Sequence, residues 1–207
     1  MNNIIFLGDS ITDAFHNMDG ANSLGRGYVR RIADRLYDDG YKGEIRNAGH
    51  DGFTAAGVLR MLEYDCLRQQ PDLVSVLVGC NDAGIYMNTG KTLKEQGFQQ
   101  NYEELLRRLT YETKASVVCM GPFIFPFPEE YANWIPTIKE AENIERRAAE
   151  KYGAVFLPLH DRLNEVAGEI GYYAVTTDGI HLTERGAHIV ADEWIHCIDF
   201  LPCQLHG

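Results

Sequence analysis

The sequence predicts an α/β fold in which helices cover both faces of a parallel sheet. Five short apolar runs alternate with longer stretches whose apolar residues recur at helical spacing, a pattern typical of strand–helix–strand units. The run at 73–78 is apolar at almost every position, as expected for a central strand buried on both faces. The chain has 207 residues, of which 45% are hydrophobic and 24% charged, ordinary values for a globular protein. We therefore expect one domain over residues 1–207.

The strands and helices are expected to alternate along the whole chain. The predicted strands cover residues 3–7, 44–48, 73–78, 116–120 and 154–157. The predicted helices cover about 28–36, 54–66, 98–109, 136–148, 160–168 and 183–198. The segments 83–97 and 123–134 show no clear period, so we predict them to be loops.

Residues with known preferences mark several helix ends. Thr54 is a suitable N-cap, and Pro136 suits the first turn of its helix because the missing N–H would have no partner there. Gly40 and Gly153 follow the last apolar residues of two helices, where glycine accepts the left-handed conformation at a helix end.

Charge and composition exclude several classes of partner. The net charge of −11 argues against nucleic acid or an anionic membrane surface as the main partner. No apolar run approaches the ~20 residues of a membrane span, and the first residues show no leader or cleavage site, so we expect a cytoplasmic protein. The five cysteines are odd in number and widely spaced without a Cys-x-x-Cys pair, which favours reduced thiols over disulfides or a zinc site. They are Cys66, Cys80, Cys119, Cys197 and Cys203.

The first candidate functional residue is Ser10, which follows the first strand in the sequence Gly8-Asp9-Ser10. Open α/β sheets build their sites at the carboxyl ends of the strands. A serine at the turn into the next element can present its hydroxyl near free backbone N–H groups. The alternative is that Ser10 only caps a helix.

A second candidate group is Asp178-Gly179-Ile180-His181, near the end of the chain. Loops at the carboxyl edge of a parallel sheet converge even when they are far apart in sequence. A serine nucleophile needs an imidazole base, and the base needs a carboxylate that fixes its tautomer. Asp178 and His181 can meet in a helical turn, so these two side chains can form a triad with Ser10. The alternative is an exposed Asp–His pair at a helix start.

Acyl transfer also needs donors for the oxyanion that develops in the transition state. Asn81, after the third strand, offers a side-chain amide, and Gly52, after the second, offers an unobstructed backbone N–H. The backbone N–H of Ser10 would be the third donor. Alternatively, Asn81 only forms a turn and Gly52 only allows a positive φ.

These residues together resemble a known family. Gly8-Asp9-Ser10-Ile11, Asn47…Gly52, Gly79-x-Asn81-Asp82 and Asp178-x-x-His181 are similar to the ordered blocks of the SGNH (GDSL-type) esterases. The resemblance covers essentially the whole chain and implies a flavodoxin-like three-layer α/β/α sandwich with a five-stranded parallel sheet.

The same resemblance implies functional roles for the matching residues. Ser10, Asp178 and His181 would be the catalytic triad, and Ser10, Gly52 and Asn81 the oxyanion hole, with no cofactor and no metal. Two features depart from the family pattern. Ile11 replaces a leucine, and His50 has no family role, so we expect His50 to be a surface residue.

Other classes of function remain as alternatives. A flavodoxin-like domain that binds a nucleotide or flavin would need a phosphate-binding glycine loop, and neither common form follows any strand. A metal-dependent hydrolase could use carboxylates at strand ends to hold Mg²⁺. Those carboxylates would be Asp9, Asp13, Asp82 and Asp178. Within the esterases, a lysophospholipase or thioesterase is the alternative.

The substrate is predicted from the segment 123–134, which holds five aromatic residues and two prolines. Aromatic faces beside hydrogen-bonding groups suit sugar rings, so we expect Asp9, Phe123 and Trp134 to contact the substrate. The sequence Gly25-x-Gly27-Tyr28-Val29 is also similar to bacterial carbohydrate acetylesterases of the same family. We therefore expect a short-chain ester, most simply an acetyl ester of a sugar or oligosaccharide. The alternative is that the aromatic residues pack the loop or form a contact in a homo-oligomer.

Overall fold

The sheet is built from five strands, all of them parallel. The computed structural model describes residues 2–20 and 22–198, and the strand order is β2-β1-β3-β4-β5. This order is that of flavodoxin-like folds. The predicted α/β fold with a five-stranded parallel sheet is confirmed. The strands are β1 (Asn3–Gly8), β2 (Glu44–Gly49), β3 (Leu73–Leu77), β4 (Ser116–Met120) and β5 (Val155–Leu157).

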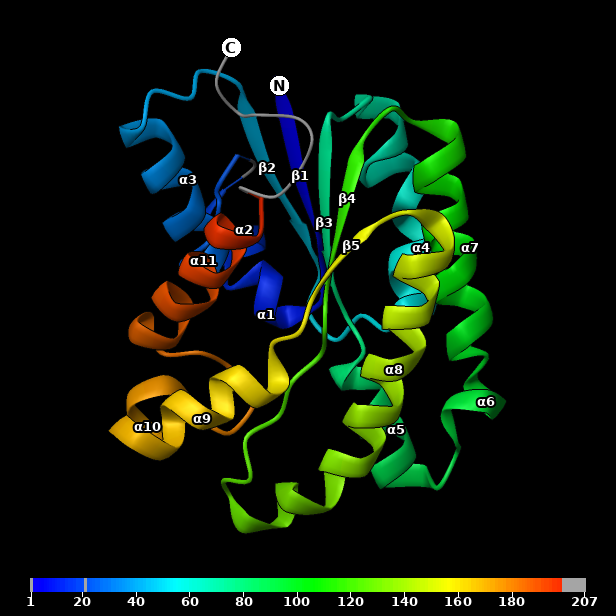
Figure 1. The fold of residues 1–207 in the computed structure, drawn as a ribbon, viewed down its shortest axis with the longest axis vertical. Helices are drawn as coiled ribbons and strands as arrows, with labels where there is room; N and C mark the ends of the chain where they lie inside the picture. Colours follow the sequence, from blue (N-terminus) through cyan, green and yellow to red (C-terminus); the bar gives the residue numbers. More distant parts are fainter. Residues whose placement is uncertain (1, 21, 199–207) are drawn as a thin grey trace.

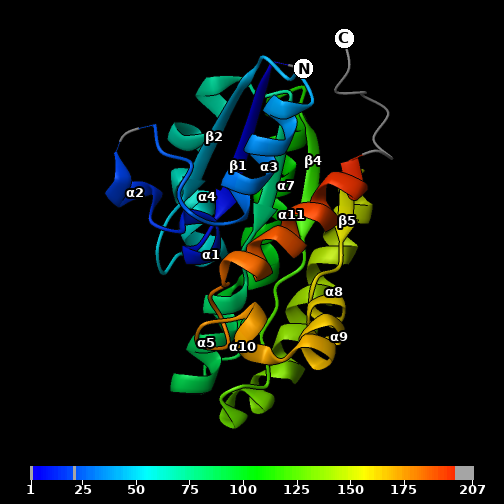
Figure 2. The same cartoon turned by 90° about the vertical axis from the view of Figure 1, so that its left-hand side faces the viewer.

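Helices cover both faces of the sheet and complete three layers (Figure 1). One face is covered by α3 (Tyr28–Asp38) and α11 (Glu184–Ile198), the other by α4 (Ala55–Asp65), α7 (Phe98–Glu112) and α8 (Ile135–Tyr152). Figure 2 shows the same layers from the side of α3 and α11. Among the predicted helix ends, the Thr54 side chain accepts from the Gly57 N–H at 3.3 Å, and Gly153 ends α8 with φ 70°.

The remaining elements are short, and most of them lie at the carboxyl edge of the sheet. They are α1 (Ser10–Asp13), α2 (His16–Asp19), η1 (Leu67–Gln69), α5 (Cys80–Thr89), α6 (Leu93–Gln96), η2 (Glu129–Trp134), α9 (His160–Ile170) and α10 (Tyr172–Val175).

The prediction of a loop at 83–97 is wrong, because this segment belongs to α5 and α6. The buried residues of α5 lie in its first half and are small or polar, so the sequence shows no apolar stripe there. In α6, Thr92 and Glu95 form a reciprocal capping box that stabilises a helix of one turn. The prediction of a loop at 123–134 is correct for its first half, but its second half forms the 3₁₀ helix η2.

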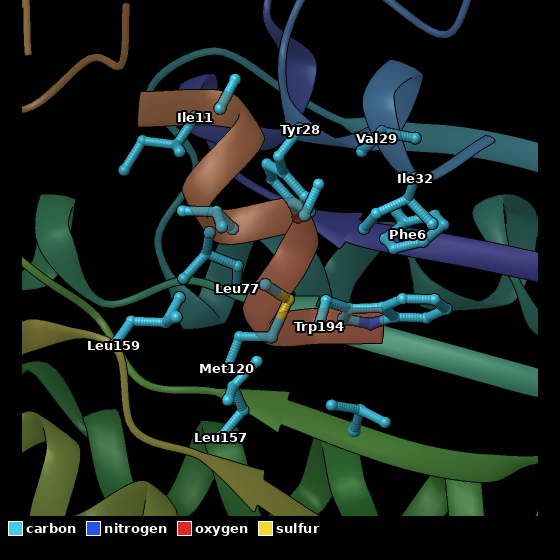
Figure 3. Close-up of a cluster of buried hydrophobic side chains, with 14 of the residues drawn as sticks. Phe6, Ile11, Tyr28, Val29, Ile32, Leu77, Met120, Leu157, Leu159 and Trp194 are labelled. Carbon is cyan, nitrogen blue, oxygen red and sulfur yellow. The ribbon is translucent and has the colours of Figure 1, made fainter. Parts of the chain in front are cut away.

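Successive side chains of β1 point to opposite faces of the sheet and pack in two different hydrophobic cores. In β1, Phe6 packs with α3 and α11, whereas Ile5 and Leu7 pack with α4 and α7. In the core between the sheet and the helices α3 and α11, the ring centroids of Trp194 and Phe6 lie 5.3 Å apart (Figure 3). Its indole N–H donates to the hydroxyl of Ser75 on β3 at 2.6 Å, and both residues are completely buried. This hydrogen bond joins α11 to the centre of the sheet.

Two further sequence-based expectations bear on the described residues. Cys66, Cys80, Cys119 and Cys197 are free thiols, while Cys203 lies outside the described residues. Across 2–20 and 22–198, none of the helices combines the length and apolar character that crossing a bilayer requires.

The buried Trp194–Ser75 hydrogen bond gives a test of the packing between α11 and the sheet. Replacing Ser75 by alanine leaves the indole N–H without a partner in an apolar core. We expect Ser75→Ala to lower the free energy of unfolding by ~1–3 kcal/mol. Urea titration followed by tryptophan fluorescence measures this change in the free energy of unfolding. In a Trp194→Phe background, which has no N–H to satisfy, the same change should cost less; an equal cost in both backgrounds would contradict the role of the hydrogen bond.

Candidate active site

The carboxyl ends of three adjacent strands meet at the same level, and each is followed by a predicted site residue. Gly8 of β1 pairs with Gly49 of β2 and with Leu77 of β3. Ser10 is the first residue of α1, directly after β1. Gly52 follows β2, and Asn81 lies in the first turn of α5 after β3. The register of the sheet therefore brings these three residues to one edge.

Ser10 is positioned by the tight start of α1. Asp9 is the N-cap, and its carboxylate accepts the Ile11 N–H at 3.0 Å. A Cβ on Gly8 would lie 2.2 Å from the Thr12 hydroxyl oxygen and 2.4 Å from the Leu77 carbonyl oxygen. Only glycine allows this close approach, so α1 begins directly against the ends of β1 and β3.

The Ser10, His181 and Asp178 side chains form one hydrogen-bonded chain. The Ser10 hydroxyl lies 2.9 Å from His181 Nε2, and His181 Nδ1 lies 2.6 Å from a carboxylate oxygen of Asp178. When Nδ1–H donates to Asp178, Nε2 is left to accept the Ser10 proton. An imidazole placed in this way can take a proton from the hydroxyl and return it to a leaving group.

Backbone hydrogen bonds hold the Asp178–His181 turn in this geometry. The second oxygen of Asp178 accepts the N–H groups of Ile180 at 2.9 Å and His181 at 2.7 Å. Partial burial disfavours the charge of Asp178, but hydrogen bonds from the His181 ring and from both N–H groups outweigh burial and lower the pKa of the carboxyl. Thr176 closes the turn, since its hydroxyl donates to the His181 carbonyl at 2.7 Å.

The three predicted oxyanion donors differ in their partners. Among the described residues, the backbone N–H groups of Ser10 and Gly52 have no hydrogen-bond acceptor. Gly52 has φ +71°, a conformation that favours glycine. The Asn81 amide donates one hydrogen to the Phe53 carbonyl at 2.9 Å, which leaves its second N–H to donate elsewhere.

His50 has a structural role that the sequence did not reveal. Its ring nitrogen Nε2 lies 2.7 Å from a carboxylate oxygen of Asp65 in α4, and its ring stacks on Phe53 at 4.4 Å between centroids. The Phe53 N–H also donates to the His50 carbonyl at 3.2 Å, which closes the turn that contains Gly52. His50 is partly exposed at the surface, and in addition to the predicted surface position it holds this turn against α4. Fifteen residues separate His50 from Asp65, and no short motif signals that contact.

A cleft of about 500 Å³ opens beside the triad. Ser10, Asp178 and His181 line it together with residues between 13 and 27. The other lining residues are Ile11, Asp13, Ala14, Phe15, Met18, Arg26, Gly27, Asp51, Thr177 and Leu182.

The predicted substrate contacts are not found at this cleft. Asp9 is 1% exposed and Phe123 is 0% exposed, so both predictions are wrong, because neither side chain can reach a bound ligand. Trp134 is half-buried and packs on Tyr131 at 4.9 Å between centroids, in a cluster that includes Ile180, and it is not among the residues that line the cleft. The Phe125 N–H instead donates to the Gly179 carbonyl at 2.9 Å. The aromatic residues of the segment 123–134 therefore pack against the rest of the protein, which was the alternative to substrate binding.

The buried carboxyls near this edge have separate hydrogen-bond partners. Burial raises the pKa of Asp9 to about 7 and that of Asp82 to about 6. Asp82 accepts the Ala55 N–H at 3.1 Å, while Asp178 is paired with His181. Within the described part of the chain, no three His, Cys, Asp or Glu side chains are arranged to hold a metal ion.

Comparison with known proteins identifies the family. Residues 6–189 match the model of the GDSL-like Lipase/Acylhydrolase family, so the chain belongs to that family. An acetylxylan esterase of Geobacillus stearothermophilus is 28% identical over 206 residues, which span 95% of this chain and 94% of the relative. The chain is thus a carboxylic ester hydrolase, as the sequence predicted.

Solved structures agree with the fold. A GDSL-like lipase from Parabacteroides merdae matches with a TM-score of 0.88 and 24% identity, over 96% of this chain and 95% of that one. The acetylxylan esterase Axe2 of Geobacillus stearothermophilus matches with a TM-score of 0.83 and 24% identity, over 96% and 94%. Structures of Axe2 include catalytic mutants in which a serine, an aspartate or a histidine is replaced by alanine.

The raised pKa of Asp9 predicts a pH-dependent cost of burying this carboxyl. Between pH 4 and 7 the unfolded chain loses the Asp9 proton while the folded chain keeps it, so this group stabilises the fold less as the pH rises. Asparagine has the same shape, can still cap α1 and does not titrate. We expect the free energy of unfolding of Asp9→Asn, measured relative to that of wild type, to rise by ~3 kcal/mol from pH 5 to pH 8.

Denaturant unfolding of both proteins at the two pH values measures this difference. Comparing Asp9→Asn with wild type at each pH cancels the contribution of the other titrating groups to the free energy of unfolding. A stability difference that is the same at pH 5 and pH 8 would mean that Asp9 keeps the same charge in both states.

Proposed function

We propose that this chain is a serine esterase that removes short acyl groups, acetyl above all, from a sugar or oligosaccharide through a covalent acyl-enzyme. The observation that carries the proposal is the hydrogen-bonded chain from Ser10 through His181 to Asp178, with distances of 2.9 and 2.6 Å. A carboxylate, an imidazole and a hydroxyl in this order form an activated nucleophile.

The proposed reaction follows from the direction of these hydrogen bonds. His181 Nε2 takes the Ser10 proton as the serine oxygen attacks the ester carbonyl carbon. The carbonyl oxygen gains negative charge, which the N–H groups of Ser10 and Gly52 and the amide of Asn81 stabilise. The C–O bond to the alcohol then breaks, and His181 gives its proton to the leaving oxygen. Water attacks the acyl-serine by the same route, while Asp178 stabilises the imidazolium.

The relatives support these roles. In the Axe2 structures, the mutated aspartate and histidine are three residues apart, as are Asp178 and His181 here. The mutated serine lies near the start of that chain, as Ser10 does in this one. The relative's substrate, acetylxylan, supports an acetylated sugar as the substrate class. A lysophospholipase or thioesterase activity is the second candidate, and a cytoplasmic location stays a prediction.

The nucleophile is tested by removing its hydroxyl. Ser10→Ala should reduce kcat on p-nitrophenyl acetate by at least ~10³-fold while the protein stays folded, because the acyl-enzyme can no longer form. An organophosphonate should label wild type at Ser10, as peptide mass spectrometry will show. Ser116→Ala is the matched control, since Ser116 lies at the opposite end of the sheet, at the start of β4. Near-normal kcat in Ser10→Ala would contradict the proposed mechanism.

The acyl group and the alcohol are tested with a substrate series. With p-nitrophenyl esters from acetyl to octanoyl, kcat/KM should peak at acetyl or propionyl and fall steeply by octanoyl. Acetate release from a peracetylated xyloside should also be measurable. A preference for long acyl chains, or for acyl-coenzyme A over every sugar ester, would instead favour the lysophospholipase or thioesterase reading.

A further inference from the structure

We propose that Phe15, Met18 and Arg26, on the segment that follows Ser10, form the subsite that binds the sugar ring of the leaving alcohol. This inference rests on the proposed function and names the residues that select its substrate. The sugar-binding surface is thus assigned to these three residues and not to the aromatic segment 123–134, which packs against the protein.

The subsite is placed by the lining of the cleft. The cleft is lined by Ser10 and His181 but not by Gly52 or Asn81. The carbonyl oxygen of a reacting ester points toward the oxyanion donors, whereas the leaving oxygen must lie where His181 can protonate it. The volume beside His181, which Gly52 and Asn81 do not line, therefore receives the alcohol part of the ester.

The backbone of the segment 13–27 is held in place at its base. Ala14 and Phe15 have φ +40° and +70°, a conformation that non-glycine residues adopt only when their surroundings impose it. The Ala14 carbonyl accepts the Arg26 N–H at 2.8 Å, and the Ala14 N–H donates to the Ser10 carbonyl at 2.9 Å. The buried Asn47 amide adds hydrogen bonds to the carbonyls of Thr12 at 2.6 Å and Leu24 at 2.9 Å. These contacts couple the position of Phe15 to that of Ser10.

The result is an exposed apolar surface at the mouth of the cleft. Phe15 is 54% exposed and Met18 is 80% exposed, although both are large and apolar. The Arg26 guanidinium lies 5.2 Å from the Phe15 ring centroid, and two hydrogen bonds to Asp19, at 2.9 and 2.7 Å, hold it there. Arg26 thus supports the ring, and the rest of the ring surface stays open to a ligand.

The chemistry of the lining favours a sugar over a fatty-acyl chain. A pyranose has apolar C–H faces that stack on an aromatic ring and hydroxyl groups that need hydrogen-bond partners. Phe15 and Met18 supply the apolar surface, and Arg26, Asp51 and Thr177 supply polar groups around it. An alkyl chain in this position would contact Phe15 and Met18 but would form no hydrogen bonds with the polar groups.

The test compares an ester that carries a sugar ring with one that does not. In wild type and Phe15→Asn, kcat/KM is measured as acetate release from acetylated methyl xyloside and from ethyl acetate. Asparagine tolerates the positive φ, so it removes the ring without straining the backbone. The ratio of the two kcat/KM values should fall by ~10-fold, mainly through KM for the xyloside. Phe15→Tyr should restore the ratio, and Met18→Gln should lower it in the same direction.

Tyr111→Asn is the matched control, because Tyr111 is another exposed aromatic residue, in α7 on the far helical layer. It should leave the ratio as in wild type. An unchanged ratio in Phe15→Asn, or a change only in oligomeric state by light scattering, would overturn the subsite. If wild type hydrolyses neither ester, the proposed function itself fails, so the two failures are distinguishable.

Discussion

The close approach of the chain at the ends of β1 and β2 is the constraint on which the site depends. Gly8 and Gly49 pair across these strands, and a Cβ on Gly49 would lie 2.3 Å from the Asp13 backbone nitrogen. Without side chains at both positions, α1 lies directly on the strand ends. Ser10, at the start of α1, and the segment 13–27, at its end, are placed by the same packing.

The protein buries several carboxyls beneath this edge, at a cost to stability. Glu145 of α8 is completely buried, and neither of its oxygens has a hydrogen-bond partner within the described residues. Burial raises its pKa well above the ordinary range, and the nearby Asp82 adds to the effect. The Gly79 backbone, between β3 and α5, lies against Glu145, so this carboxyl packs directly behind the turn that carries Asn81. Burial and the neighbouring carboxyls both disfavour ionisation of Glu145.

Most of the fold and the triad could be predicted from the sequence, because both depend on short-range patterns. Strand runs, helical spacing and caps are local, and Asp178 and His181 are three residues apart. The sequence failed where three-dimensional packing decides. Phe123 and Phe125 are in the core, yet nothing in the sequence of an aromatic loop distinguishes a ring that binds a ligand from one that packs. The contact between His50 and Asp65 likewise joins two elements only in the folded chain.

The serine and histidine of the proposed triad are 171 residues apart along the chain, so the two side chains are synthesised at different times. The ribosome produces Ser10 and the strand that presents it before the other four strands. The imidazole of His181 follows only after all five strands have been made, just before α11. While those four strands are synthesised, the nascent chain therefore carries the Ser10 hydroxyl without its proposed base. Ester cleavage becomes possible only once nearly the entire sheet and its helices can assemble.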